Sequence, residues 1–419
     1  MDDTSPAESI DNTKEKKKSR RPANTAFRQQ RLKAWQPILT PKTVIPLFFV
    51  IGIICAPIGG LLIYASSTVK ELRIDYTNCF RDAPTDTAGP MDASLVFPSF
   101  KENNTIDALW QRAFPINHTY NGFTVENLTR CTLTFKIPEE MSAPVLLYYR
   151  LENFYQNHRR YVSSFYDKQL ADDPSVTYDS VANSLCQPLA VNDTLRKAYY
   201  PCGLIANSQF NDTIGNPVLL NAPAQEGTLN QTYEMKNTSI AWESDKELYK
   251  PRTSTNYDDI LPPPNWQIRY PNGTYTAEFP PPDLHDDEHF IVWMRTAGLP
   301  TFSKLYGRND TSNMAIGTYS MDIVDNFRTD QYQGKKSIVI TTLSVMGGKN
   351  NFLGILWLVV GGFCIALALL FLITNLIKPR KLGDHTYLSW NNAPSSAAAK
   401  GKGKASGPAI GMATGRDLS

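Results

Sequence analysis

Two long stretches of this 419-residue sequence lack charged side chains altogether. They cover residues 44–65 and 352–377, which as helices would reach about 33 and 39 Å at 1.5 Å per residue. The hydrocarbon core of a bilayer is about 30 Å thick, so each stretch is long enough to cross it. A helix in a soluble core rarely runs this far without a polar edge, which disfavours that alternative. We therefore expect two transmembrane helices.

The charge that these stretches lack is concentrated beside them. Residues 1–43 carry ten Lys/Arg and five Asp/Glu, and residues 378–419 carry seven and two, so each tail is +5. The net charge of +2 then leaves −8 for residues 66–351. Because basic flanks stay in the cytoplasm, we expect two cytoplasmic tails, the second largely disordered, and an extracytoplasmic domain between the helices. The polar N-terminal tail precedes an apolar run too long for a cleavable signal peptide, so the first helix would be a signal anchor.

Cysteine is scarce, with six residues, and no Cys-x2-Cys spacing is present. That absence argues against a zinc site, whose paired cysteines are separated by about two to four residues. Four cysteines lie in residues 66–351, where an extracytoplasmic compartment would oxidise them to disulfides. They allow three connectivities, and we favour the one that closes the smaller loops, Cys79–Cys131 with Cys186–Cys202.

Asn-X-Ser/Thr sequons are absent from both tails and both apolar stretches. All nine lie in residues 66–351, at Asn103, Asn117, Asn127, Asn192, Asn211, Asn230, Asn237, Asn272 and Asn309. Part of this distribution is chance, because the tails contain few asparagines. It nevertheless agrees with the charge and the cysteines, and it predicts N-linked glycans on the central domain.

The central domain shows no long helical pattern. Short alternating or apolar runs separated by Pro, Gly and Asn turns predict strands at residues 132–137, 145–151, 290–295 and 337–345. Only short helices are expected, for example over residues 106–114 and 152–164. The predicted fold class is a membrane protein with two transmembrane α-helices and a large, mainly β extracytoplasmic domain with short helices.

Small residues recur at regular intervals within both apolar stretches. Gly52, Ala56 and Gly60 are four positions apart in the first, and a spacing of seven runs from Gly354 to Ala368 in the second. Small side chains let another helix approach closely. The pattern predicts close helix packing, either between the two stretches or against the helices of a partner.

Catalytic motifs are almost entirely missing. There is no G-x-x-x-x-G-K-[ST] phosphate loop and no G-x-S-x-G elbow, and neither apolar stretch carries Asp, Glu, His, Lys or Arg for an ion path. The exception is His285-Asp-Asp-Glu288-His289, which fits the H-x-x-E-H pattern of zinc peptidases. Three prolines just upstream and the expected strand just downstream instead favour a solvated acidic turn. A lumenal metal-dependent hydrolase remains the alternative.

Residues 148–161 mix aromatic side chains with arginines, among them Arg159 and Arg160. In a cytosolic protein this mixture would suggest nucleic-acid binding. In an extracytoplasmic domain it favours core aromatics beside an arginine-rich rim that contacts another protein, and no nucleic acid.

Several segments, in order along nearly the whole chain, resemble one family. They are RPANTAFRQQR (21–31), AWQPILT (34–40), NFYQNHRRY (153–161), PCGLIANSQFNDT (201–213), IAW (240–242), FIVWMRTAGLPTF (290–302) and MGGKN (346–350). The chain resembles the cell division control protein 50 / ligand-effect modulator family, the accessory β subunits of type-IV P-type ATPase phospholipid flippases.

The resemblance implies two membrane helices, a mainly antiparallel β domain, and neither catalysis nor a cofactor of the chain's own. The pump subunit would hydrolyse ATP and carry the lipid path, while this chain stabilises the pump and allows it to leave the endoplasmic reticulum for the Golgi, endosomes or plasma membrane. By position, Cys186 and Cys202 match a family disulfide, and Asn211 matches a family glycan site. A stand-alone glycosylated receptor is the third alternative.

Eight residues are expected to contact the pump. The resemblance implies that residues 21–40 lie along its cytoplasmic face, and aromatic and arginine side chains usually dominate such interfaces. The expected contacts are Phe27, Arg28, Arg31 and Trp35 in that segment, and Arg159, Arg160, Trp293 and Arg295 in the central domain.

Overall fold

The computed structural model describes residues 24–33, 39–101, 106–220 and 230–379. The chain divides into two compact units, one of residues 56–359 and the other of residues 1–55 with 360–419. The helices α1 (Pro41–Ser67) and α9 (Phe352–Ile377) each have one half in either unit. Both are long and apolar enough to cross a membrane, so the prediction of two such helices is confirmed.

Glycines bring α1 and α9 together within each unit. In the unit of residues 56–359, a Cβ added to Gly59 would lie 2.9 Å from the carbonyl oxygen of Gly354. In the other unit, a Cβ added to Gly52 would lie 3.0 Å from the carbonyl oxygen of Gly361. These contacts show that the helices pack on each other. A Cβ on Gly60 would meet nothing within 4 Å, so Gly60 does not belong to this contact face, although the four-residue spacing placed it there.

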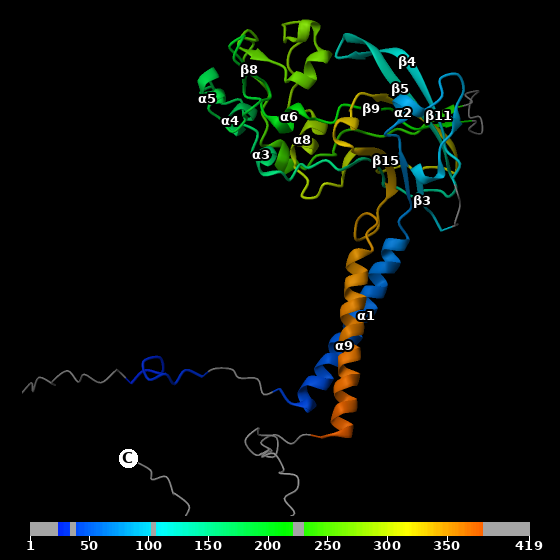
Figure 1. Ribbon diagram of the computed structural model, residues 1–419, viewed down its shortest axis with the longest axis vertical. Helices are drawn as coiled ribbons and strands as arrows, with labels where there is room; N and C mark the ends of the chain where they lie inside the picture. The colour runs from blue at the N-terminus through cyan, green and yellow to red at the C-terminus, as the bar shows by residue number, and fades with distance from the viewer. Residues whose placement is uncertain (1–23, 34–38, 102–105, 221–229, 380–419) are drawn as a thin grey trace, which may run out of the picture. The chain divides into compact units, whose positions relative to one another are not determined.

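Two antiparallel sheets form most of the domain between the helices (Figure 1). The five-stranded sheet has the order β13-β6-β15-β1-β3. Its strands are β1 (Glu71–Asp75), β3 (Val96–Ser99), β6 (Val145–Glu152), β13 (Phe302–Asn309) and β15 (Lys335–Thr342). The seven-stranded sheet has the order β11-β10-β14-β5-β4-β2, with β9 paired to β14. Its strands are β2 (Gly89–Pro90), β4 (Leu109–Tyr120), β5 (Phe123–Ile137), β9 (Thr213–Ile214), β10 (Val218–Leu220), β11 (Asn230–Thr232) and β14 (Gly317–Asp325).

The remaining elements are short. A third sheet joins β7 (Val191–Asn192), β8 (Lys197–Tyr199) and β12 (Ile260–Leu261). The helices of the domain are α2 (Cys79–Asp82), α3 (Arg159–Val162), α4 (Asp167–Leu170), α5 (Tyr178–Ala182), α6 (Leu204–Asn207), α7 (Glu243–Lys246) and α8 (Glu288–Met294). Short 3-10 turns cover η1 (Ala93–Leu95), η2 (Pro264–Arg269), η3 (Pro271–Gly273) and η4 (Asp330–Tyr332).

The core lies where side chains of the two large sheets meet. Cys131, Leu133, Phe135 and Ile137 are buried at every second position of β5, as the two-residue period of a strand requires. They belong to one buried cluster with residues of β1, β6, β14 and β15. The strands predicted over 132–137 and 145–151 are therefore confirmed as parts of β5 and β6, and the one predicted over 337–345 is confirmed for residues 337–342 of β15 but extends past its end.

Three predictions of local structure are wrong. Residues 106–114, expected to be helical, enter β4, because a hairpin turn with positive φ at Asn121 and Gly122 pairs this segment with β5. Of residues 290–295, expected to be a strand, residues 290–294 are helical in α8, which starts where the Asp287 carboxylate accepts a hydrogen bond from the Phe290 amide. Only the four residues of α3 are helical within 152–164.

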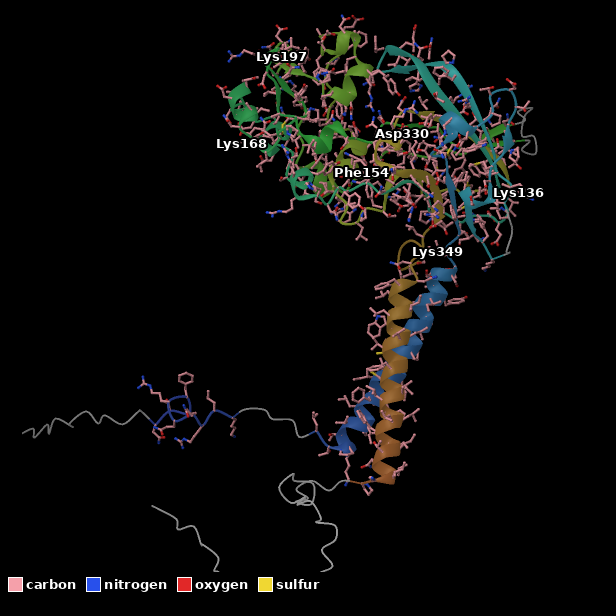
Figure 2. All side chains as sticks on the ribbon, in the orientation of Figure 1. Lys136, Phe154, Lys168, Lys197, Asp330 and Lys349 are labelled. Atoms are coloured by element: carbon pink, nitrogen blue, oxygen red, sulfur yellow. A yellow bond between two sulfur atoms is a disulfide. The ribbon has the colours of Figure 1, made fainter. Side chains whose placement is uncertain are left out.

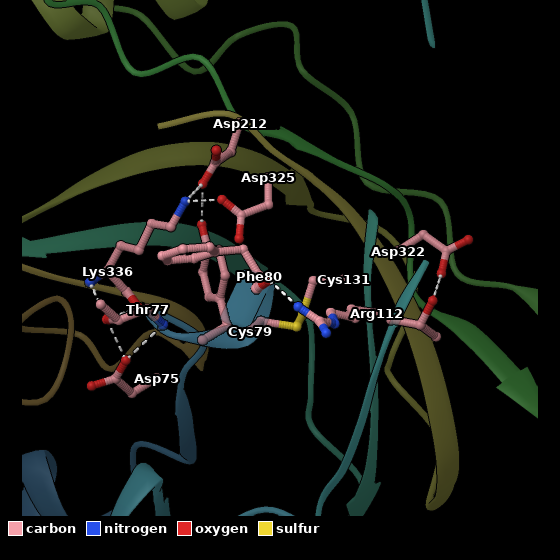
Figure 3. The surroundings of a disulfide bond; sticks show 12 residues. Asp75, Thr77, Cys79, Phe80, Arg112, Cys131, Asp212, Asp322, Asp325 and Lys336 are labelled. Atoms are coloured by element: carbon pink, nitrogen blue, oxygen red, sulfur yellow. Dashed lines mark hydrogen bonds and ion pairs between the residues drawn. A yellow bond between two sulfur atoms is a disulfide. The ribbon is translucent and has the colours of Figure 1, made fainter. Parts of the chain in front are cut away.

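The two disulfides join Cys79 to Cys131 and Cys186 to Cys202, with Cα–Cα distances of 6.1 and 5.7 Å. This is the connectivity that the smaller loops favour. The first joins α2 to β5 in the main core (Figure 3). The second lies in a separate buried cluster. Both therefore reinforce packed regions.

Candidate functional site

The helix α8 is fixed at its N-terminus by the acidic motif that resembles a zinc peptidase. The Glu288 carboxylate accepts hydrogen bonds from the backbone amides of Ser239, Ile240 and Ala241 at 2.6–2.9 Å. It also lies 2.7 Å from the Lys246 ammonium. Burial alone would raise the pKa of Glu288, but these hydrogen bonds lower it to about 2. The carboxylate is thus fully engaged in holding residues 239–241 to α8.

The two histidines of the motif do not join Glu288 in a metal site. His285 precedes the helix, and its Nδ1 lies 3.0 Å from the carbonyl oxygen of Tyr249. The His289 ring packs against Tyr306 at 4.4 Å between centroids. Within the part of the chain that the structure describes, no three His, Cys, Asp or Glu side chains are grouped to hold a metal. The solvated turn predicted for this motif is confirmed only at its start, where residues 285 and 286 lie in a turn and Asp286 is exposed, whereas Glu288 is buried at the first position of a helix.

Trp293 anchors the middle of α8 in the core. Its side chain is fully buried, and its indole N–H donates to the Ile205 carbonyl at 2.7 Å. It packs edge to face on Phe154, which is labelled in Figure 2. The expectation that Trp293 contacts a partner is therefore wrong: a large aromatic next to arginine in the sequence indicates an interface only when the ring reaches the surface.

The C-terminal end of α8 is capped by a buried lysine. The Lys304 ammonium donates to the carbonyl oxygens of Val292, Trp293 and Arg295 at 2.9, 2.7 and 2.5 Å. Burial, and then the charge of Arg295, lower the pKa of Lys304 to about 7. Donors at the last turn satisfy carbonyls that have no partner in the helix, so Lys304 fixes the point where Arg295 leaves α8.

The Arg295 side chain, at the end of α8, stacks on an exposed tryptophan. Its guanidinium lies 3.3 Å from the ring centroid of Trp242, the residue after the segment that Glu288 holds, and 3.8 Å from the Asp245 carboxylate. Trp242 is 62% exposed. A hollow of about 240 Å³ beside Arg295 is lined by apolar side chains that include Phe165 and Leu248. We call Trp242, Arg295, Phe165 and Leu248 the α8 surface.

The α8 surface has the composition of a protein interface. Trp and Arg are the side chains most enriched among residues that anchor binding, and Phe is also enriched at interfaces. Trp242 was not among the expected contacts, although it lies in a segment, residues 240–242, that carries the family resemblance. Arg159 and Arg160 are also exposed, on α3.

The pump contacts expected in residues 21–40 belong to the unit of residues 1–55 with 360–419. Residues 24–33 form a turn in which Phe27 is 77% exposed and the Arg31 guanidinium donates to the Asn24 side chain. Arg28 is exposed as well. Trp35 lies outside the described residues. In the same unit, a groove of about 580 Å³ lies between the start of α1 and the end of α9. Its lining residues fall within 39–45 on the first side and within 371–378 on the second.

A buried cluster of charges holds the two sheets together. The Lys336 ammonium lies 2.7 Å from both the Asp212 and the Asp325 carboxylates and donates to the Phe327 carbonyl at 2.7 Å (Figure 3). The Tyr76 hydroxyl donates to Asp212 at 2.8 Å. Burial raises the pKa of Tyr76 well above its usual range, and the charge of Asp212 adds to the rise. These groups connect β15, β14 and the segment before β9, so the cluster is part of the scaffold of the domain.

The predicted glycan sites differ in exposure. Exposed asparagines are Asn117, Asn127, Asn230, Asn237 and Asn272, half-buried ones are Asn192 and Asn211, and Asn103 lies outside the described residues. Asn309 is buried, and its Nδ2 donates to the Glu234 carbonyl at 2.8 Å. Because a glycan is attached through Nδ2 and this side chain is buried, Asn309 is the least accessible sequon among the described residues, and its glycosylation stays a prediction.

Known proteins resemble this chain over nearly its whole length. The sequence profile of the LEM3 (ligand-effect modulator 3) / CDC50 family matches residues 62–381. The chain is 43% identical to the phospholipid-transporting ATPase accessory subunit CDC50 of Chaetomium thermophilum, over 88% of this chain and 91% of that protein. It is 40% identical to the accessory subunit CRF1 of Saccharomyces cerevisiae, over 90% of both chains. It is 36% identical to cell cycle control protein 50A of Mus musculus, over 85% and 90%.

Proposed function

Because this chain belongs to the LEM3/CDC50 family, we propose that it is the non-catalytic β subunit of a phospholipid flippase. In this role it forms a heterodimer with a type-IV P-type ATPase and is needed for the pump's stability, its exit from the endoplasmic reticulum and its activity. The observation that carries the proposal is that relatives aligned over about nine-tenths of both chains are named accessory subunits of phospholipid-transporting ATPases. The pump, and not this chain, moves phospholipid to the cytoplasmic leaflet.

The arrangement in the membrane follows from charge. Residues 1–43 and 378–419, each +5, are cytoplasmic tails, and residues 66–351, at −8, are extracytoplasmic. Two disulfides and the exposed sequons support this placement, since both modifications are acquired in the secretory pathway. The pair of packed helices spans the bilayer between them.

Two surfaces are proposed to hold the pump. Outside the membrane, the α8 surface offers Trp242 stacked on Arg295, which lines a mainly apolar hollow, with Arg159 and Arg160 as further exposed cations. On the cytoplasmic side, residues 21–40 interleave basic with aromatic side chains, including the exposed Phe27. Buried aromatic and arginine anchors dominate most protein interfaces, whereas isolated surface charges add little.

Affinity purification of the tagged full-length chain from its own membranes tests the proposal. We expect one large ATPase to co-purify in equal amount, and phospholipid-stimulated ATP hydrolysis to require both chains. Loss of this chain should leave that ATPase in the endoplasmic reticulum. If the chain purifies without an ATPase, or if the ATPase reaches its membrane and works without this chain, the proposal is wrong.

A further inference from the structure

A cleft of about 560 Å³ in the central domain contains one of the predicted glycan sites, Asn211. The cleft lies among the described residues of the 56–359 unit, and its volume is typical of small-molecule sites, which run from about 300 to 1,000 Å³. The exposed residues Asn121, Pro280 and Asp283 lie at its rim, so it opens to solvent. Asp212, Asp287 and His289, which belong to the charged scaffold and to the start of α8, also line it.

The walls of the cleft combine rings with polar edges. Tyr120, Phe279 and Tyr306 contribute aromatic rings, and residues 280–282 add three consecutive prolines. Arg269 and His289 bring polar groups to the same space. Arg269 has no carboxylate partner within the described chain, and its guanidinium lies 5.5 Å from the ring centroid of Tyr120. Flat apolar faces edged by hydrogen-bonding groups fit a pyranose, which has a face of C–H groups and a rim of hydroxyls.

Asn211 is held rigidly at this cleft. The preceding residue, Phe210, stacks on Tyr149 at 4.0 Å between centroids. The following residue, Asp212, forms a buried ion pair with Lys336 at 2.7 Å. The Asn211 carbonyl accepts a hydrogen bond from the Asn326 side chain. The side-chain Oδ1 of Asn211 is buried and has no hydrogen-bond partner among the described residues. A buried acceptor without a donor contributes no stabilising hydrogen bond, so the backbone contacts of Asn211 and the packing of its two neighbours hold it at the cleft.

We infer that Asn211 carries an N-linked glycan whose first N-acetylglucosamine is seated in this cleft. The inference rests on the extracytoplasmic placement proposed above, but not on binding of the pump. The sugar is bonded directly to Nδ2, so it must lie next to Asn211, where the cleft is. Attachment also makes the contact intramolecular, which gives even a weak sugar–aromatic contact a high effective concentration. Asn117 and Asn237 are exposed and do not line the cleft, so their first sugars stay in solvent.

The test is the release of glycans from the native protein by peptide-N-glycosidase, which cuts the bond between Asn and the first sugar. The full-length chain is treated in detergent, alone and with its pump, and each site is followed by mass spectrometry of labelled peptides. We expect release from Asn211 to be at least about tenfold slower than from Asn237, because the bond is reached only after the sugar leaves the cleft. Denaturation should remove the difference.

Two variants separate the cleft from other causes of protection. Phe279→Ala removes a wall of the cleft and should speed release from Asn211 without changing Asn237. Tyr155→Ala removes an exposed ring that does not line the cleft and should change neither rate. Asn211→Gln should lower the melting temperature of the chain more than Asn237→Gln does.

Several results would overturn the inference, and they are distinguishable from failure of the proposed function. Equal release rates at Asn211 and Asn237, or an unmodified Asn211 beside a glycosylated Asn237, would refute the seated sugar alone. Protection that appears only with the pump present would mean that the pump shields the glycan. An absence of glycans at every sequon would instead refute the extracytoplasmic placement, and the inference with it. Failure to bind an ATPase would leave the release rates as expected.

Discussion

The substitution Lys336→Met isolates the buried charge at the centre of the scaffold. Methionine keeps much of the length of the lysine side chain and removes its ammonium group. The Lys336 side chain is 1% exposed, and those of Asp212 and Asp325 are fully buried. The variant therefore leaves two carboxylates facing each other in the core without their shared cation.

The expected cost is a large part of the stability of the domain. Removing one partner of a buried ion pair typically costs about 3–5 kcal/mol, against a total of about 5–15 kcal/mol for a folded protein. Here one cation serves two carboxylates and the Phe327 carbonyl, so the upper end of the range applies. At about 5 kcal/mol, and with roughly 2–4 °C per kcal/mol for large domains, Tm should fall by about 10–20 °C.

The loss should depend on pH, because Asp325 can take up a proton. Burial raises the pKa of Asp325 to about 6, and the charge of Lys336 limits the rise. The pKa of Asp325 in the folded state is therefore above that of a free aspartate, about 3.9. Because the folded state binds this proton more tightly, the stability that protonated Asp325 contributes is complete below about pH 4 and is lost as the pH rises through about 6. Removing Lys336 raises the folded-state pKa further. The cost of Lys336→Met should therefore be smaller near about pH 5.5 than near about pH 7.5.

The assay is thermal unfolding of the detergent-solubilised chain with its pump, followed by fluorescence-detected size-exclusion chromatography. The neighbouring Lys335→Met is the control, because Lys335 is exposed and surface substitutions usually change stability by less than about 0.5 kcal/mol. Adding Asp325→Asn to Lys336→Met should recover part of the loss, since it removes one of the unpaired charges. Equal Tm values for the two lysine variants, with no pH dependence, would refute the reasoning.

Four further predictions concern the interface and the framework. Arg295→Ala should weaken association with the pump in co-purification while Tm stays nearly unchanged, because the guanidinium is exposed; normal association would remove Arg295 from the interface. Glu288→Gln should lower Tm, and the stability that Glu288 contributes should be complete above about pH 4.3 and lost as the pH falls toward about 2, since its folded-state pKa is depressed. A zinc-selective chelator in excess Mg²⁺ should leave lipid transport unaffected, because the pump needs only Mg²⁺ for ATP; transport lost under these conditions would support the metal-dependent hydrolase. Cys186→Ser should retain both chains in the endoplasmic reticulum, because losing a native disulfide costs about 2–5 kcal/mol, and normal delivery to the surface would contradict this. Trp35→Ala should weaken the complex more than Lys16→Ala if residues 21–40 bind a protein groove, whereas equal, small effects would indicate that they only touch anionic lipid.

Regular periodicity explains why some of the fold was predictable. The membrane helices are uncharged over more than twenty residues, a pattern with few alternatives, and both were predicted nearly to their ends. In β5, burial alternates over Cys131–Ile137, so the two-residue period is visible in the sequence itself. The strand β15 is buried at seven successive positions, and its run of apolar and β-branched residues indicated a strand for that reason.

Where local sequence was ambiguous, distant contacts decided the structure. Residues 106–114 could be a helix by their own composition, but pairing with β5 makes residues 109–114 part of the strand β4. The segment Phe290–Met294 was predicted to be a strand because it is apolar and contains β-branched residues. It is helical because Asp287 caps its start and Lys304, from a neighbouring strand, binds the carbonyls at its end. Neither partner can be identified from the spacing of residues within the segment.

The acidic motif shows why chemistry read from spacing needs the fold to interpret it. Glu288 was suspected of activating water on a metal, and such a role needs a carboxylate with a free lone pair. Instead its oxygens bind three backbone amides and Lys246, and this contact places Trp242 beside the end of α8. Lys304 fixes Arg295 at the same end, so the two buried charges together position the exposed pair on the α8 surface. If that surface holds the pump, substitutions at Glu288 or Lys304 should weaken association through the geometry of Trp242 and Arg295, without either buried residue touching the partner.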